Sequence, residues 1–201
     1  RFAGITNYRD PKTFKKDSPS RGLLVSRFLM GIDGPRAYLE ALEKYADRYN
    51  GFNIILGHND EIYWYSNRAE GIRRLAPGIY GVSNHLLDTP WPKVVKGKSA
   101  FTRLVSETPL PGPEEFFRIL ADRGSAPDRE LPDTGVGVEQ ERMLSPVFVS
   151  SHDYGTCSST LLFIDRDNRV TFMERRYIRD PKGPSSVRYD FHLTGSEDNK
   201  E

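Results

Sequence analysis

The chain has 201 residues, of which 37% are hydrophobic, 11% aromatic and 28% charged. This composition is typical of a folded globular chain, because a largely disordered chain carries few aromatic residues, and the length suits one domain over residues 1–201. The 29 basic and 28 acidic side chains nearly cancel. This balance removes the electrostatic reason to expect a nucleic-acid partner or a strongly anionic membrane surface.

Cysteine content and hydropathy exclude further classes of protein. Cys157 is the only cysteine, so an intrachain disulfide and a multi-cysteine zinc or iron–sulfur site are excluded. No apolar run approaches the roughly 20 residues that cross a bilayer, which predicts no transmembrane segment. The chain opens with Arg1, leading directly into a predicted strand, and this opening resembles neither a native start nor a signal peptide. We therefore expect that an N-terminal segment is missing.

The N-terminal half predicts strands at both ends of a helical pair. Turn residues and alternating apolar residues predict strands, whereas apolar residues at intervals of three and four predict helices. The predicted strands are residues 2–8, 52–56, 62–65, 72–75 and 79–82, and the predicted helices are residues 21–30 and 35–50. The strands at 52–56 and 62–65 are separated by a short polar turn, which predicts a hairpin.

The C-terminal half predicts two helices followed by a group of strands. The predicted helices are residues 93–105 and 113–120, and the predicted strands are residues 147–149, 159–164, 170–176 and 187–193. Residues 123–141 are polar and rich in Gly and Pro, which predicts a long loop or lid. Tight hairpins and paired helices without regular βαβ alternation predict an α+β fold, in which helices cover antiparallel sheets.

The sequence carries no strong cofactor motif. It lacks a glycine-rich phosphate loop, and its four histidines lack the spacing of a helical metal site, so we expect neither a metal ion nor a bound cofactor. Cys157 and His152 are a possible nucleophile and base. The alternative is that Cys157, at the entry of an apolar strand, is a small buried packing residue.

Two asparagines stand at predicted strand ends, where a fixed side-chain amide can stabilise a developing oxyanion. Asn7 follows the first strand, and Asn84 follows the strand at residues 79–82. Because asparagine is also common in turns, ordinary turn chemistry remains the alternative for both residues.

Several stretches, in order along nearly the whole chain, resemble the Transport and Golgi organisation 2 family, also called the NRDE family after an Asn-Arg-Asp-Glu motif near its N-terminus. The most specific stretch begins Pro77-Gly78-Ile79-Tyr80 and continues through Ser83-Asn84 to Leu87-Asp88-Thr89-Pro90-Trp91-Pro92-Lys93. The other matching stretches are residues 3–9, 20–24, 49–53, 154–156 with 159–160, and 172–175.

The resemblance implies an N-terminal-nucleophile (Ntn) hydrolase-like αββα sandwich, with two antiparallel sheets between helical layers, similar to penicillin V acylases and bile-salt hydrolases. In that group an N-terminal cysteine attacks a non-peptide amide, with its own α-amine as the base. By analogy Asn7 and Asn84 match the asparagines that shape the oxyanion hole. The weaker candidates to line the same cleft are Tyr8, Arg9, Ser83, Trp91 and Thr156.

The departures from the family pattern favour a second reading. The 201 residues contain neither the N-terminal cysteine nor the Asn-Arg-Asp-Glu motif, so we expect this chain to be inactive as an amidase. Cys157 stands where many members carry arginine, which puts a substrate contact in doubt. Eukaryotic relatives are associated with haem trafficking, lipid metabolism, and Golgi and mitochondrial organisation.

The alternative function is therefore a non-catalytic binder of an amphipathic small molecule, such as haem as cargo or an acyl lipid, in the cytoplasm with mitochondrial or Golgi association. A structural or interaction role is a third reading, because fold does not fix function. The oligomeric state stays open.

Overall fold

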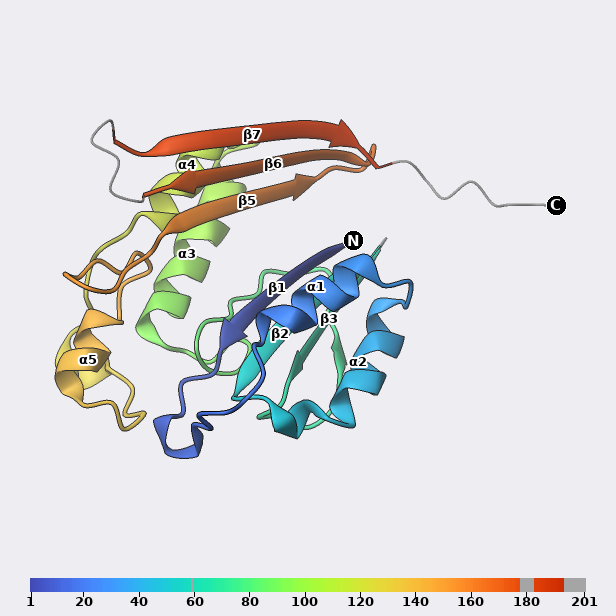
Figure 1. Ribbon diagram of the computed structural model, residues 1–201. Coiled ribbons are helices and arrows are strands. Elements are labelled where there is room, and N and C mark those ends of the chain that lie inside the picture. The colour runs from blue at the N-terminus through green and yellow to red at the C-terminus, as the bar shows by residue number, and fades with distance from the viewer. Residues whose placement is uncertain (59, 178–182, 194–201) are drawn as a thin grey trace.

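The computed structural model describes residues 1–58, 60–177 and 183–193. The described strands form two separate antiparallel sheets (Figure 1). The first sheet has the order β1-β2-β3-β4, with bounds Phe2–Asn7, Phe52–His58, Glu61–Ser66 and Arg73–Arg74. The second has the order β5-β6-β7, with bounds Ser158–Ile164, Arg169–Arg176 and Ser185–His192.

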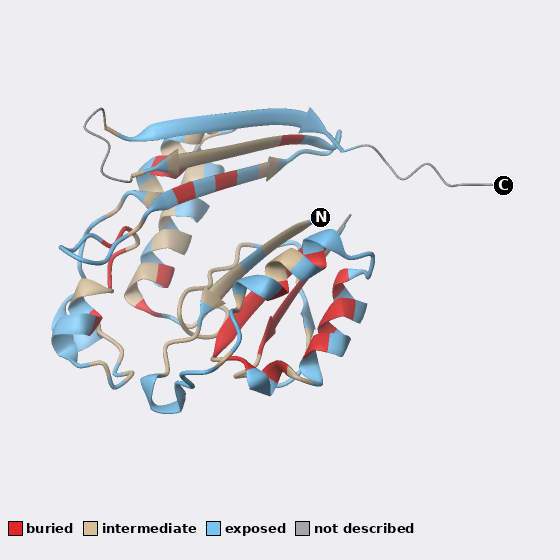
Figure 2. Cartoon of the chain, viewed as in Figure 1, coloured by how far each residue is buried: buried red, intermediate tan, exposed pale blue. Residues whose placement is uncertain are grey.

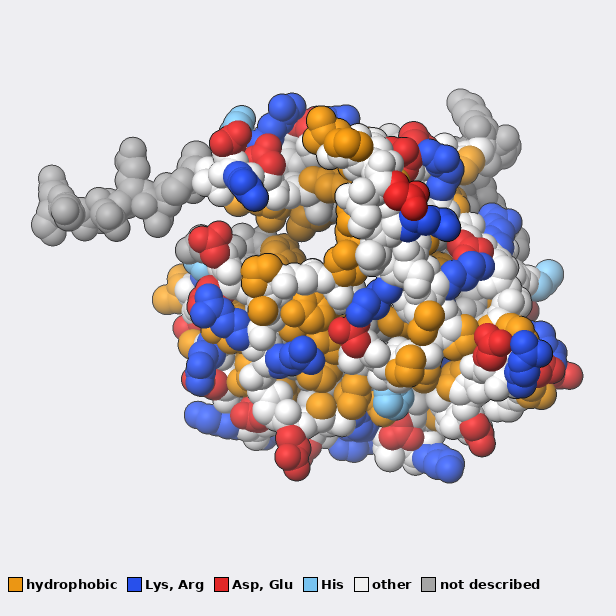
Figure 3. All heavy atoms as spheres, turned by 180° about the vertical axis from the view of Figure 1, so that it is seen from behind, with side chains coloured by type: hydrophobic (Ala, Val, Ile, Leu, Met, Phe, Trp, Pro, Cys, Tyr) orange, Lys and Arg blue, Asp and Glu red, His pale blue; other side chains and the backbone are white. Residues whose placement is uncertain are grey.

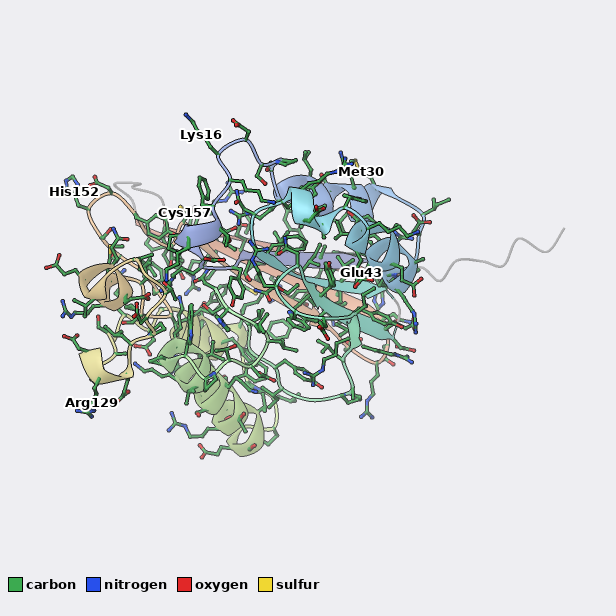
Figure 4. All side chains as sticks on the ribbon, turned by 90° about the horizontal axis from the view of Figure 1, so that it is seen from below. Lys16, Met30, Glu43, Arg129, His152 and Cys157 are labelled. Carbon is green, nitrogen blue, oxygen red and sulfur yellow. The ribbon has the colours of Figure 1, made fainter. Side chains whose placement is uncertain are left out.

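Helices cover the two sheets from opposite sides. The α-helices are α1 Gly22–Met30, α2 Pro35–Glu43, α3 Pro92–Glu107, α4 Pro113–Leu120 and α5 Val138–Met143. Short 3-10 helices are η1 Pro11–Thr13, η2 Ala46–Arg48 and η3 Asp128–Glu130. Seen from below, α1 and α2 lie on one side of the molecule and α3 and α4 on the other, with the strands between them (Figure 4). This arrangement confirms the predicted α+β sandwich of two antiparallel sheets.

The larger hydrophobic core joins the first sheet to α1 and α2. Alternate residues of β2, namely Phe52, Ile54 and Leu56, are fully buried on the helix side of the sheet. They pack with apolar residues of both helices, among them Phe28 and Leu39, which are also fully buried. The period of two along the strand and of three or four along the helices therefore points both apolar faces to one core.

A smaller core joins the second sheet to α4. Phe116 and Phe117 pack against Leu161 of β5, and Arg175 lies over the Phe117 ring at 4.0 Å. The opposite face of this sheet buries Val170 but exposes other apolar residues, for example Tyr189 of β7, and Figure 2 shows the whole of β7 as exposed. Seen from behind, an opening rimmed by hydrophobic side chains is visible (Figure 3). It lies at the level between β5 and β1 in Figure 1.

Most predicted elements are confirmed, and four are corrected. The predicted helix at residues 35–50 is divided into α2 and η2. The Asn67 side chain donates to the carbonyl groups of Ala46 and Tyr49, and these bonds hold residues 46–49 in a tighter turn. Residues 79–82 and 147–149 form no named strand. The predicted loop at 123–141 contains η3 and most of α5. None of the described helices is long and apolar enough to span a membrane.

Candidate functional site

A segment that we call the cleft loop, residues 76–91, connects the first sheet to α3. Asp88 closes this loop on itself: its carboxylate accepts from the Gly81 N–H at 2.8 Å, and its own N–H donates to the Gly81 carbonyl at 2.7 Å. Lys98 of α3 donates to the same carboxylate at 2.6 Å. A Cβ atom at Gly81 would lie 2.8 Å from Val94 Cγ1, so glycine permits this close approach of the loop to α3. These bonds use the backbone groups that a strand ladder would need, which explains why the predicted strand at 79–82 is absent.

The cleft loop rests on a buried polar residue of the first sheet. Asn53 of β2 is 1% exposed, and its Nδ2 donates to the His85 carbonyl at 2.9 Å and to Thr6 Oγ1 at 3.2 Å. Trp64 Nε1 donates to Asn53 Oδ1 at 3.3 Å. Every polar atom of this buried amide is hydrogen-bonded, so Asn53 holds the cleft loop in a fixed position against the sheet.

Four charged and amide side chains converge where β1, the cleft loop, α3 and α5 meet. Arg9 forms an ion pair with Glu141 of α5, and both side chains are largely buried. Asn84 Oδ1 accepts hydrogen bonds from Lys93 Nζ at 3.2 Å and from Arg9 Nη2 at 3.5 Å. Lys93 Nζ also donates to the Leu144 carbonyl at 3.0 Å. The cluster thus joins three segments that are far apart in the sequence.

Aromatic side chains enclose one side of this polar cluster. The Arg9 guanidinium lies over the Trp91 ring at 4.9 Å, a distance at which cation–π attraction contributes. Tyr8 Oη and His85 Nε2 are hydrogen-bonded at 2.7 Å, and Thr89 bonds the other ring nitrogen at 2.8 Å. Burial lowers the pKa of His85, so the neutral imidazole is favoured and both of its nitrogens are engaged.

A cleft of about 590 Å³ opens beside the polar cluster. Its walls come from residues 78–83 of the cleft loop, the first half of α3, the end of α4 and Val147. Most of these side chains are apolar, and the charged ones are Lys93 and Lys98. A second cavity of about 480 Å³ lies against α3 and residues 124–127, and it shares Lys93 and Val147 with the first. Lys93 is therefore placed at the boundary between the two cavities.

Burial, together with the nearby Arg9 guanidinium, lowers the pKa of Lys93 from its ordinary value of 10.5 to about 8, although Glu141 acts in the opposite direction. At a pH between these two pKa values, Lys93 is protonated in the unfolded chain and deprotonated in the folded chain. This residue therefore makes the free energy of unfolding increase as the pH rises from about 8 to 10.5.

We expect the pH dependence of stability to change when Lys93 is replaced by methionine. Urea denaturation of the wild type and of Lys93→Met should give stabilities whose difference shifts in favour of the wild type as the pH rises through this window. Tyr38 and Tyr65, whose pKa values burial raises from 10.0 to about 12, contribute the opposite trend at the alkaline end. That trend cancels in the comparison because both proteins carry these tyrosines. A constant difference across the window would contradict the shifted pKa.

The structure brings most of the predicted site residues together. Asn84 Nδ2 donates to the backbone carbonyl of Asn7 at 3.1 Å, and Ser83 Oγ donates to Asn84 Oδ1 at 3.3 Å. With Tyr8, Arg9 and Trp91 in the contacts given above, six of the seven predicted residues join one network. Their catalytic and binding roles stay predictions. The Asn7 side chain is exposed, and it makes no hydrogen bond to any other described residue.

Thr156 does not join this network within the described part of the chain. Its hydroxyl accepts from the Val149 N–H at 3.0 Å, and its own N–H donates to the Val149 carbonyl at 2.9 Å. Both bonds close a local turn beside the isolated bridge between Ser150 and Gly155. The observed contacts of Thr156 are therefore those of a residue that holds its own loop.

Cys157 and His152 do not form a nucleophile–base pair. The Cys157 thiol is exposed and donates to the Gly155 carbonyl at 3.6 Å, while His152 Nδ1 bonds Asp153 at 2.5 Å. Figure 4 places His152 at the tip of its loop, apart from Cys157. The exposure of Cys157 also contradicts the alternative of a buried packing residue.

No group of three or more His, Cys, Asp or Glu residues in the described ranges is arranged to hold a metal ion.

Sequence reasoning missed the charged partners of the network. Lys93 lies in the most specific family stretch, but the sequence analysis assigns it no role. That stretch is the signal that could have identified it. Glu141 is buried at 2% exposure although it lies in a polar segment without periodicity. Its role depends on the long-range contact with Arg9, which no local pattern predicts.

Comparison with known proteins shows the family to which the chain belongs. The family model described as Transport and Golgi organisation 2 matches residues 1–179. The chain is 34% identical over 208 residues to the Transport and Golgi organization protein 2 homolog of Bos taurus, covering 96% of the chain and 75% of that relative. It is 34% identical over 207 residues to the Homo sapiens homolog, with the same coverage. The Drosophila melanogaster protein of this name is 25% identical over 188 residues, covering 84% of the chain and 65% of that relative. The chain belongs to the Transport and Golgi organisation 2 family.

Proposed function

We propose that the protein binds an amphipathic small molecule with an acidic head group in the cleft between the cleft loop, α3 and α4. The observation that carries this proposal is a large apolar cleft with a lysine ammonium in its wall. The volume of about 590 Å³ lies within the usual range of small-molecule sites, which are mostly apolar with a few polar groups that orient the ligand.

The apolar walls supply the driving force for binding. Val94 and Phe101 extend from one face of α3, and Ile119 and Leu120 extend from the end of α4. Phe101 is 38% exposed, so a ligand that covers it removes apolar surface from water. Burial of apolar surface contributes about 25 cal/mol per Å², and an alkyl chain is an effective means of covering these walls.

Lys93 supplies the polar end of the proposed site. Within the described ranges no carboxylate forms an ion pair with its ammonium group, whereas Lys98 is paired with Asp88. A carboxylate ligand would therefore give Lys93 a charged partner without breaking an existing ion pair. Fatty acids and the propionates of haem share this chemistry, and we propose them as the first ligands to compare, haem as cargo rather than as a resident cofactor.

Filling the cleft with a larger side chain is expected to weaken ligand binding without unfolding the protein. A Cβ atom at Gly97, between Val94 and Phe101 on α3, would meet no atom within 4 Å. In Gly97→Leu the new side chain should occupy the cleft and weaken dodecanoate binding by about tenfold or more, which corresponds to about 1.4 kcal/mol or more. Calorimetric titration measures the dissociation constant.

Two controls accompany this titration. Gly97→Ala makes a similar gain in helix propensity and leaves most of the cleft open, so it should bind nearly as well as the wild type. Dodecanol lacks the carboxylate and should bind more weakly, because a hydrogen bond to a charged group contributes about 1.5–3 kcal/mol. Equal affinity of Gly97→Leu and the wild type would overturn the proposed site, and haem is titrated in the same series.

A second candidate function is hydrolysis of a non-peptide amide, which is favoured by the contact between Asn84 and Asn7. Asn84 Nδ2 has two hydrogens, and its bond to the Asn7 carbonyl uses one of them. The other could be donated to an oxyanion near the polar cluster. This candidate requires a nucleophile that the printed sequence does not identify, and we therefore place it second. A cytoplasmic location, with Golgi or mitochondrial association, is likewise a proposal, and the family name supports only its Golgi part.

A further inference from the structure

The amine of Lys93 has contacts that differ from those of an ordinary surface lysine. Its Nζ donates to two uncharged oxygens, Asn84 Oδ1 at 3.2 Å and the Leu144 carbonyl at 3.0 Å. A carboxylate that would hold the ammonium form in a direct ion pair is not within contact among the described residues. The Arg9 guanidinium shares the Asn84 acceptor, so a second cation stands close by.

The groups that face this amine come from every element around it. Arg9 follows β1, Glu141 belongs to α5, and Asn84 belongs to the cleft loop. Glu141 is engaged by Arg9 and also accepts from Thr134, so its charge is largely committed to other partners. Burial and the proximity of a cation both favour the neutral amine, which is the arrangement found in lysines that act as nucleophiles.

The amine of Lys93 can be reached from two cavities. Lys93 is a wall residue of both cavities, so a small molecule in either cavity can approach its amine. The rest of the first cavity is largely apolar, which limits the water that competes for a carbonyl group there. We propose that Lys93 is a covalent capture site for aldehydes, with hydrophobic aldehydes as the preferred class. For these the inference rests on the proposed ligand-binding function of the cleft.

The chemistry is a condensation that needs no oxidant or reductant. The nitrogen lone pair of neutral Lys93 attacks the aldehyde carbon, forming the C–N bond, and the carbonyl π electrons move to oxygen. A proton passes from nitrogen to that oxygen and gives the carbinolamine. Loss of hydroxide as water, with a second proton from nitrogen, then leaves the imine. The balance is one aldehyde and one amine converted into one imine and one water, and the reaction is reversible.

The test is reductive trapping of the intact chain with limiting aldehyde and sodium cyanoborohydride, which supplies the hydride. Propanal is used first, because it is small enough to reach the amine without needing the apolar walls. Peptide mapping should show that Lys93 is modified at least about tenfold faster at about pH 7 than Lys44, which is exposed at the end of α2. Modification of Lys44 and other exposed lysines with Lys93 unmodified would overturn the proposal.

Variants and a longer aldehyde separate this proposal from the proposed binding function. Lys93→Arg keeps the charge but forms no stable imine and should lose the fast adduct, whereas Lys44→Arg should keep it. If Lys93→Arg does not fold, the peptide map of the wild type still decides the result. Dodecanal should react faster than propanal, and dodecanoate should protect Lys93 from both.

The two proposals can fail separately. If propanal modifies Lys93 rapidly but dodecanoate neither binds nor protects, the capture site stands and the acid-binding function fails. If dodecanoate binds in the cleft and Lys93 still reacts no faster than Lys44, the binding function stands and the capture site is overturned.

Discussion

Replacing Glu141 with alanine is expected to lower the free energy of unfolding by about 3–5 kcal/mol, because removal of one partner of a buried ion pair leaves the other charge uncompensated. Glu141 and Arg9 have side chains that are 3% and 11% exposed. The same carboxylate accepts from the Thr134 N–H at 3.0 Å and the Thr134 hydroxyl at 2.5 Å. Its loss therefore detaches α5 and the preceding loop from the polar cluster. Urea denaturation followed by circular dichroism measures the change.

Glu139 provides a matched control for this substitution. It lies two residues earlier on α5 and is exposed. Glu139→Ala should change the stability by no more than about 0.5 kcal/mol, as is usual for surface positions. If Glu141→Ala were as stable as Glu139→Ala, the Arg9–Glu141 pair would not be the support of the site that the structure indicates.

Replacing Asn84 with alanine is expected to separate the two proposed functions. If the protein hydrolyses an amide with Asn84 as an oxyanion donor, turnover should decrease by about 100-fold or more, as it does when one donor of an oxyanion hole is removed. If the protein is a binder, the affinity for dodecanoate should change by far less than 100-fold, because Asn84 is not among the wall residues of the cleft.

The measurement uses an amide substrate panel and the dodecanoate titration on the same protein preparations. Ser83→Ala is the neighbouring control for turnover alone, because Ser83 also lines the cleft that the dodecanoate titration probes. Within the described residues, the Ser83 hydroxyl contacts the network through its bond to Asn84 Oδ1 at 3.3 Å. This substitution should leave any turnover nearly unchanged. Measurable turnover that is equal in the wild type and Asn84→Ala would exclude the oxyanion assignment.

The sequence predicts the elements whose pattern agrees with their burial. In α3 the bounds Pro92–Glu107 are close to the predicted 93–105, because proline at the first turn and apolar spacing both mark this helix. The hairpin of β2 and β3 is confirmed because two runs rich in buried apolar and aromatic residues flank a short polar stretch of sequence.

The wrongly predicted elements are those that a local apolar pattern does not determine. The cleft loop carries apolar residues typical of a strand at 79–82, but Asp88 takes the hydrogen-bonding groups of Gly81 and folds the segment into a loop. In the same way, α5 has only the six residues Val138–Met143, which is too short for an apolar periodicity to emerge. An apolar pattern predicts neither a loop that one polar side chain closes nor a helix of under two turns.

The candidate site was likewise predicted only in part. Arg9, Asn84 and Trp91, which the family stretches single out, lie in one network, and their functional roles stay predictions. Of the candidate cleft residues only Ser83 lines this cleft, and its apolar walls were not predicted, since they come from the cleft loop, two helices and Val147. No single stretch of sequence contains enough of that surface to reveal it.

The most direct test of the central proposal is a titration of isotopically labelled protein with dodecanoate, followed by backbone amide NMR shifts. We predict that the largest shifts occur at Gly81, Gly97 and Leu120, which line the cleft, and that they saturate at one ligand per chain. The exposed apolar face of the second sheet offers the competing surface. Shifts confined to Tyr189 and Phe191 of β7, or no saturable shift at all, would contradict a ligand site in the cleft.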